Sequence, residues 1–133
     1  MTLAEIKNQV MFQTNNDAED LGDYEPHIND YVNEGYDRLV SAWAKSHVSQ
    51  GEYDPLEIDS DEPLLPEWTH RALVDYATWL IYRNGNPQKQ QRGMTFLNAF
   101  KEIESKILDE GGASGLNEDG TTKRYNKFRN IPV

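Results

Sequence analysis

The sequence contains no cysteine and no long apolar run. Without cysteine, the chain can form no disulfide, no thiolate nucleophile and no cysteine-ligated metal site, and its composition suits a reducing compartment. No apolar stretch approaches the roughly 18 residues that a membrane-spanning helix needs. The first ten residues, MTLAEIKNQV, lack the basic and then apolar order of a secretory signal. We therefore expect neither membrane insertion nor secretion.

Basic residues are scarce over most of the chain, whose net charge is −10. Residues 1–67 hold 3 Lys/Arg against 16 Asp/Glu, residues 68–120 hold 6 against 7, and residues 121–133 hold 4 against none. An acidic body repels nucleic acid at long range, so sequence-specific DNA binding is not expected. An acidic body with a short basic end favours protein partners of opposite charge; a merely solvated acidic surface is the alternative.

Recognisable catalytic and metal-binding motifs are also lacking. The segment GGASG has no Lys-Ser/Thr pair to grip a phosphate, and it follows a helix where such a loop needs a strand before it. The histidines His27, His47 and His70 are isolated and are interpreted as surface or capping residues. No serine lies in a nucleophile elbow, so we expect no enzyme activity and no cofactor.

One acidic segment resembles a calcium-binding loop only in part. Counted from Asp17, the third position is Glu19 and the sixth is Gly22, but Leu21 holds the fifth and Ile28 the twelfth. The bidentate carboxylate of such a loop is therefore missing. We interpret this segment as a loop of solvated carboxylates that caps the next helix.

What the sequence does contain is helical periodicity. At 133 residues, with 37% apolar residues, the chain is long enough for one core and one domain. The spacing predicts helices over residues 2–12, 26–46, 66–84 and 87–108, and Thr2 with Glu5 predicts a capping box at the start of the first. The third helix is apolar on nearly all sides, so we expect it at the centre. The fold class is therefore all-α, a small four-helix bundle.

The last two helices are predicted to form an antiparallel hairpin at the centre of this bundle. Gly85 is expected to adopt the left-handed conformation just past the third helix, and Asn86 and Pro87 supply the N-cap and first turn of the fourth. Gly35 is expected to allow close approach of another helix or an aromatic ring. The predicted core contains Trp43, Tyr76, Leu80, Phe96 and Phe100.

The turn from Asn84 to Asn86 also resembles that of a helix-turn-helix. A recognition helix after this turn would need a basic face, and its candidates are Gln88, Lys89, Gln91 and Arg92. On an acidic protein, these four side chains are a weak DNA-reading surface.

Long irregular segments separate or follow the helices. Residues 51–67 carry three prolines and are expected to wrap the core through Leu56, Leu64 and Leu65, or to offer an acidic edge to a neighbouring subunit. We divide the chain into a helical domain, 1–108, and a flexible linker with a basic and aromatic C-terminal tail, 109–133. The candidate partner-binding residues of this tail are Lys123, Arg124, Tyr125, Lys127, Phe128, Arg129 and Ile131.

The run PEWTHRALVDYATWLIYRNGNPQKQQRG, with NDYVNEGYDRLVSAWAK upstream, resembles the small head-tail connector (adaptor or head-completion) proteins of long-tailed bacteriophages and prophages. The resemblance covers roughly residues 2–108, and its most distinctive part is ATWLIYRNGNPQKQQRG. It implies a helical bundle that assembles as a homo-oligomeric ring, thought to be twelvefold, beneath the portal protein. Such a ring extends the DNA channel and receives a tail-proximal connector or tail terminator protein.

The resemblance also implies a location at the head-tail junction of the virion, and in the host cytoplasm during assembly. An acidic channel wall would let DNA slide without sticking, and mutual repulsion would keep free subunits monomeric or weakly associated. Residues 109–133 match no motif of the connectors, so assigning the portal contact to the tail is an inference from its composition. The alternative function is a soluble acidic interaction protein, such as a phage regulator or DNA mimic.

Overall fold

The computed structural model describes residues 1–47 and 53–114. Its α-helices are α1 (Leu3–Thr14), α2 (Ala18–Leu21), α3 (Ile28–Ser46), α4 (His70–Arg83) and α5 (Pro87–Ser114). The 3₁₀ turns η1 (Asn15–Asp17), η2 (Glu25–His27) and η3 (Glu67–Thr69) lie between them. Within these ranges there is no strand, and no helix is long and apolar enough to cross a membrane. The prediction of four packed helices is confirmed, with α2 as an added single turn.

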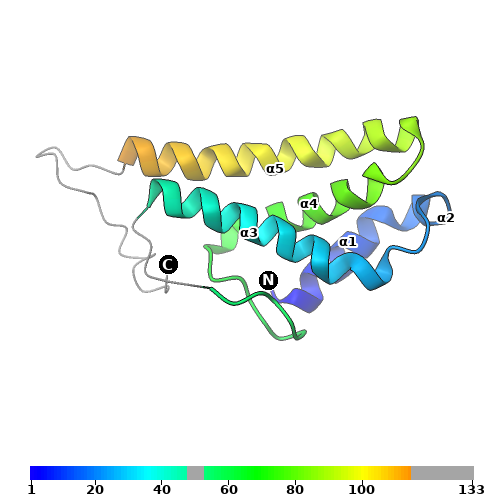
Figure 1. Cartoon of the computed structure of the whole chain (residues 1–133), viewed down its shortest axis with the longest axis horizontal. Coiled ribbons are helices and arrows are strands. Elements are labelled where there is room, and N and C mark those ends of the chain that lie inside the picture. The colour runs from blue at the N-terminus through cyan, green and yellow to red at the C-terminus, as the bar shows by residue number, and fades with distance from the viewer. Residues whose placement is uncertain (48–52, 115–133) are drawn as a thin grey trace, which may run out of the picture.

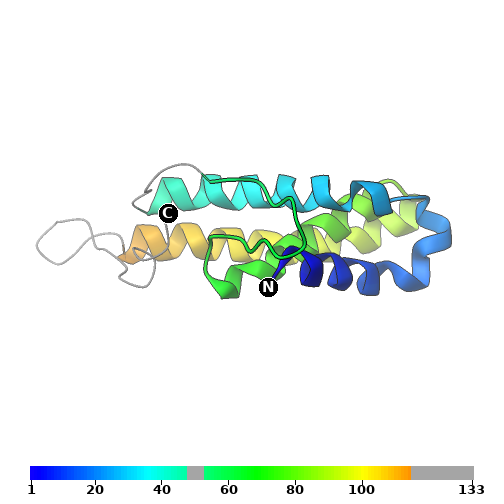
Figure 2. The ribbon, with the colours of Figure 1, turned by 90° about the horizontal axis from the view of Figure 1, so that it is seen from below.

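Helix α4 lies at the centre of the molecule. It packs against α1, α3 and α5, and α3 also packs along α5 (Figure 1). Helix α1 contacts α4 and part of α3, on the side of α4 away from α5 (Figure 2). Eleven of the 14 residues of α4 are buried, as its apolar sequence predicted. Helices α4 and α5 run antiparallel, so the predicted hairpin is confirmed (Figure 1).

The core is a single cluster contributed by all four long helices and by the segment before α4. Of the five predicted core residues, Trp43, Tyr76, Leu80 and Phe100 are buried in it, and Phe96 is half-buried against it. The largest fully buried side chains are Tyr36, Tyr82, Phe100, Leu3, Ile6, Ile28, Leu39, Leu73, Leu80, Ile81, Ile107 and Val10. A helix buried on this many sides owes its stability mainly to packing rather than to local propensity.

The helix starts follow local rules that the sequence displays. The Thr2 hydroxyl accepts a hydrogen bond from the Glu5 amide at 3.2 Å, and the Thr2 amide donates to the Glu5 carboxylate at 2.9 Å, which confirms the capping box. The Asn86 side-chain oxygen accepts from the Lys89 amide at 2.9 Å and so caps α5. Pro87 is the first residue of α5, as predicted.

The prediction of a left-handed Gly85 is wrong. Among the described residues, Gly22 is the only one with positive φ, at 77°. A Cβ built on Gly85 would instead lie 2.6 Å from the Cβ of Lys89. Glycine is therefore needed in this turn because the first turn of α5 passes too close for a side chain, and not because of its own φ.

Two glycines bring neighbouring helices close to α4. A Cβ built on Gly35 of α3 would lie 3.0 Å from the Cβ of Tyr76, and one built on Gly93 of α5 would lie 2.7 Å from the Cβ of Tyr82. Non-bonded carbon atoms pack best at about 3.5–4.0 Å, so neither site has room for a methyl group. The close approach predicted at Gly35 is confirmed.

We expect Gly93→Ala to destabilise the protein by about 1–3 kcal/mol, because the Tyr82 Cβ is fixed to the α4 backbone and cannot swing away from the added methyl. Alanine is otherwise favoured over glycine in a helix by about 1 kcal/mol. Urea unfolding followed by circular dichroism measures the difference. Asn98→Ala, on the exposed side of α5, is the matched control and should be neutral or slightly stabilising. Equal stability of the two variants would contradict the close packing at Gly93.

Four helix boundaries differ by two or more residues from those predicted. Helix α3 begins at Ile28 instead of residue 26, after the η2 turn. Helix α1 continues to Thr14, and α4 begins at His70 after the η3 turn, with Pro66 just before that turn. Helix α5 continues to Ser114 instead of ending near residue 108, so the predicted domain boundary falls within it. Glycine lowers helix propensity but keeps its backbone N–H, so the Gly-Gly pair at 111–112 does not end the helix as a proline would.

The segment before α4 wraps the core as predicted. Leu56 and Leu65 are buried, and Leu64 is half-buried against the core. Asn33 of α3 holds this segment through two hydrogen bonds to the backbone of Leu56, both 2.8 Å long. The Tyr36 hydroxyl accepts a third, from the Leu64 amide, at 2.9 Å.

Candidate functional site

The candidate partner-binding residues of the tail, Lys123 to Ile131, lie outside the described residues. The structure therefore leaves their proposed role untested. The described part of the chain contains four other features that bear on function: a buried polar cluster around Asp17, a polar cluster around His70, an exposed apolar surface on α1, and an acidic stripe on α3.

Asp17 lies between α1 and α2 and reaches the hairpin of α4 and α5. Its side chain accepts hydrogen bonds from the Tyr82 hydroxyl at 2.5 Å and from the Arg92 guanidinium at 2.6 Å, and it pairs with the Lys89 ammonium. The residue is 8% exposed. These contacts, from Lys89 first, then Tyr82 and Arg92, hold the pKa of Asp17 well below its usual range.

The Asp17 cluster corrects one interpretation of the sequence and bears on another. The acidic segment is not simply a loop of solvated carboxylates, because Asp17 is buried and paired, and no side chain caps the start of α3. Lys89 and Arg92, two of the four candidate DNA-reading residues, contact Asp17 instead of projecting freely. Within the described residues, no three His, Cys, Asp or Glu side chains converge on a possible metal position. The cluster's role is to attach the α1–α2 connection to the first turns of α5.

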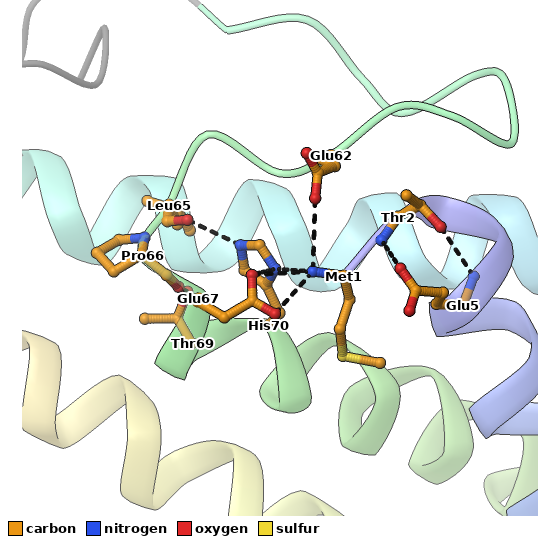
Figure 3. Close-up of polar contacts among 9 residues, drawn as sticks. All are labelled: Met1, Thr2, Glu5, Glu62, Leu65, Pro66, Glu67, Thr69 and His70. Atoms are coloured by element: carbon orange, nitrogen blue, oxygen red, sulfur yellow. Dashed lines mark hydrogen bonds and ion pairs between the residues drawn. The ribbon is translucent and has the colours of Figure 1, made fainter.

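A second polar cluster joins the start of α1 to the start of α4 (Figure 3). The N-terminal ammonium donates to both carboxylate oxygens of Glu67 at 2.9 Å and to Nδ1 of His70 at 2.8 Å. His70 Nε2 donates to the Leu65 carbonyl oxygen at 2.8 Å, so the proton of the neutral ring is on Nε2. Burial lowers the pKa of His70, which favours the neutral form of its ring.

The histidines thus occupy three different environments. His27 is exposed at the N-cap position of α3, and His47 follows the last turn of α3 and stacks on Trp43 with ring centroids 3.6 Å apart. His70 is 3% exposed, so the interpretation of all three as surface or capping residues is wrong for it. The position of His70 at the start of a strongly apolar helix is the sequence feature that could have predicted its burial.

The outer face of α1 carries the most exposed aromatic side chain among the described residues. Phe12 is 80% exposed and the adjacent Met11 is 38% exposed. Three hollows adjoin Met11. One, of about 280 Å³, lies between α1 and the bend at Gly22, and another, of about 540 Å³, lies between α1 and the segment containing Asp59. We call this surface, with Met11, Phe12, Asp23, Glu25 and Asp59, the Met11 groove.

The fourth feature is an acidic surface on α3. Asp30, Glu34 and Asp37 are exposed and recur at four- and three-residue steps, so they form one acidic stripe along the helix. Glu34 accepts a hydrogen bond from the Tyr76 hydroxyl at 3.3 Å, and Asp37 accepts one from the Tyr53 hydroxyl. Two of the three carboxylates are thus held in place.

A scan against protein-family models, a search of curated proteins and a search of solved structures each gave no match for this chain.

Proposed function

We propose that this protein is a structural virion protein of a long-tailed bacteriophage or prophage, forming a homo-oligomeric ring at the head-tail junction. In this role it binds the portal protein, extends the DNA channel and presents a surface to a tail-proximal connector or tail terminator protein. The proposal begins from the resemblance of residues 2–108 to head-tail connector proteins. Its fold expectation, a helical bundle built around a hairpin, agrees with the all-α architecture.

One observation carries the proposal furthest. The most distinctive stretch of the resemblance, residues 77–93, forms a single tertiary unit that contains the end of α4, the tight turn and the start of α5. Gly85 and Gly93 lie where an added Cβ would clash with Lys89 and Tyr82, and Lys89 also pairs with Asp17. The likeness therefore involves residues that determine this particular hairpin, and not merely apolar positions that any helix shares.

The charge of the surface supports the same function. The acidic stripe on α3, together with the exposed acids of residues 54–62, presents carboxylates that would repel a DNA backbone. A channel wall of this kind allows DNA to pass without binding it. The tail residues Lys123, Arg124, Tyr125, Lys127, Phe128, Arg129 and Ile131 remain our proposed contact with the portal, because they combine positive charge with apolar anchors.

Co-assembly with a portal ring tests the proposal. Full-length protein mixed with the portal protein of the same phage genome should form a complex containing many copies, measured by light scattering and imaged by negative-stain microscopy. Reversing Lys127 and Arg129 to Glu should reduce the bound copies about tenfold, because each weak contact is multiplied around the ring. The matched control replaces the exposed residues Lys45 and Lys101 with Glu. This variant should bind the portal in as many copies as the wild type does.

Two results would contradict parts of this proposal. A portal ring that binds no copies of the wild-type chain would remove the connector function altogether. Normal binding after the tail reversal, with helicity unchanged, would retain the connector function but place the portal contact on the helical body.

The alternative function, an acidic mimic of DNA, is favoured by the same α3 stripe, whose ordered carboxylates could occupy a positively charged DNA-binding surface. Stoichiometry distinguishes the two functions. A mimic should inhibit a DNA-binding protein as a monomer or dimer, whereas a connector should bind a portal ring in many copies and leave DNA-binding proteins active.

A further inference from the structure

The Met11 groove combines exposed apolar side chains with hollows in the surface. An 80% exposed phenylalanine stands beside a methionine that borders three hollows. Exposed aromatic side chains contribute strongly to protein interfaces, and the flexible thioether of methionine adapts to varied partners and packs well against aromatic rings. The groove therefore offers apolar contacts to an incoming segment.

The rim of the groove is acidic. Asp23 and Glu25 are exposed beside the first hollow, and Glu25 and Asp59 border the second. The one basic side chain in these linings, Lys7, is paired with Asp59 at 3.1 Å. Among the described residues, Asp23 and Glu25 form no ion pair that would reduce their charge. The rim thus favours a segment that carries positive charge alongside apolar anchors.

Residues 121–133 of the chain itself have this composition. Lys123, Arg124, Lys127 and Arg129 alternate with Tyr125, Phe128 and Ile131 over nine positions, with no acidic residue among them. Lys and Arg side chains can form charge-assisted hydrogen bonds to the rim carboxylates, while the aromatic rings contact Met11 and Phe12.

Geometry determines whose tail can reach the groove. Helix α5 has 28 residues and therefore spans about 42 Å. The end of the groove that contains Asp23 and Glu25 lies near the beginning of α5, since Leu21 of α2 is 3.2 Å from a Cβ built on Gly85 in the turn that precedes it. Figures 1 and 2 show α2 and the end of α1 at this end of the molecule, opposite the end of α5.

The tail continues from the far end of α5. Arg129 is 15 residues beyond Ser114, and a fully extended chain of that length reaches about 54 Å, so the tail spans the length of α5 only when it is nearly straight. A random-coil chain of this length has a typical span of only about 21 Å, about half the length of α5. A second copy can place its groove within that typical span.

We infer that the Met11 groove of one copy binds the C-terminal segment 121–133 of a second copy. This contact does not depend on the connector function. If the connector function is also correct, the tail has two alternative partners, the groove of a neighbouring copy and the portal, and binding of one excludes the other.

A charge exchange between groove and tail tests this inference with full-length chains and no portal. One variant carries Asp23→Lys and Glu25→Lys in the groove, and the other carries Lys127→Glu and Arg129→Glu in the tail. Sedimentation equilibrium at low salt should show weak self-association of the wild type and association at least about tenfold weaker for each variant alone. When the two variants are mixed, the basic tail of the first meets the acidic groove of the second, and a heterodimer should form.

Two controls separate this contact from general charge effects. The variant Glu102→Lys with Asp109→Lys makes the same charge change on the exposed side of α5 and should associate as the wild type does. A chain that carries both pairs of substitutions has a basic groove and an acidic tail. It should regain self-association, with the charges of groove and tail exchanged. Circular dichroism should show unchanged helicity in every variant, because all the substituted groove and control residues are exposed.

A wild-type chain that remains monomeric at millimolar concentration and low salt would overturn the inference. So would a mixture of the two variants that shows no heterodimer. The tail variant should also associate with the α5 control as strongly as with the wild-type chain, which would confirm that the acidic groove, and not α5, receives the tail.

Discussion

Phe100→Ala is expected to destabilise the protein by about 3–5 kcal/mol, the loss typical of removing a fully buried aromatic ring and leaving a cavity. Phe100 of α5 is 0% exposed. Its ring lies 4.6 Å from the Tyr76 ring of α4, and the Arg38 guanidinium of α3 lies 5.1 Å from its centroid. One side chain therefore contacts both of the helices against which α5 packs, and its removal weakens the contacts among all three.

A matched substitution separates burial from the loss of an aromatic ring as such. Phe12→Ala removes the same atoms from a side chain that is 80% exposed, so we expect a change below about 0.5 kcal/mol. Urea unfolding of the wild type and both variants measures the two losses. Because a small domain is stable by only about 5–15 kcal/mol, the Phe100 variant should unfold at a much lower urea concentration. Similar midpoints for the two variants would contradict the assigned core.

The parts of the fold that the sequence predicted well depend on residues close together in the chain. The capping box of Thr2 and Glu5 spans three residues, and the cap of α5 by Asn86 spans the same distance. The apolar character of α4 is also local, because its burial follows from a dozen neighbouring positions. Short-range patterns of this kind predict local structure directly, because helical geometry determines which positions share a face.

The errors occurred where residues far apart determine the structure. Asp17 is 65, 72 and 75 positions from Tyr82, Lys89 and Arg92, and no periodicity connects it with them. Gly85 was expected to need positive φ because glycine often does so after a helix, whereas the real constraint is the approach of Lys89. His70 contacts the first residue of the chain, 69 positions away.

The two candidate binding surfaces, the tail and the Met11 groove, differ in the same respect: only the first can be recognised from residues close together in the chain. The basic and aromatic tail was found from composition alone, because alternating charges and rings are visible in the sequence. The Met11 groove was not predicted, because the spacing of apolar residues over 2–12 does not show which of them face solvent. Only the packing of α1 against α4 shows that Ile6 and Val10 are buried while Phe12 faces solvent.

The cluster around Asp17 yields the second large effect. Asp17→Asn keeps the shape of the side chain but removes its charge, leaving the Lys89 ammonium, whose side chain is 13% exposed, without its close partner. Removing one member of a buried ion pair typically costs about 3–5 kcal/mol, and the partial exposure of Arg92 places our expectation at about 3 kcal/mol. Asp20→Asn is the control: Asp20 lies 3.7 Å from the same ammonium, but its side chain is 64% exposed, so a loss below about 1 kcal/mol is expected.

The dependence of this effect on pH provides an independent check. Hydrogen bonds from Lys89, Tyr82 and Arg92 lower the pKa of Asp17 in the folded protein from its ordinary value of 3.8. A group whose pKa is lower in the folded state stabilises that state fully above its unfolded pKa and loses the contribution as pH falls through its folded pKa. The stability difference between wild type and Asp17→Asn should therefore be constant above about pH 5 and shrink steadily below pH 4. Urea unfolding at pH 7, 5, 4, 3 and 2 measures it. A difference that stays constant down to pH 2, or one that Asp20→Asn reproduces, would show that the Asp17 carboxylate does not attach the α1–α2 connection to α5.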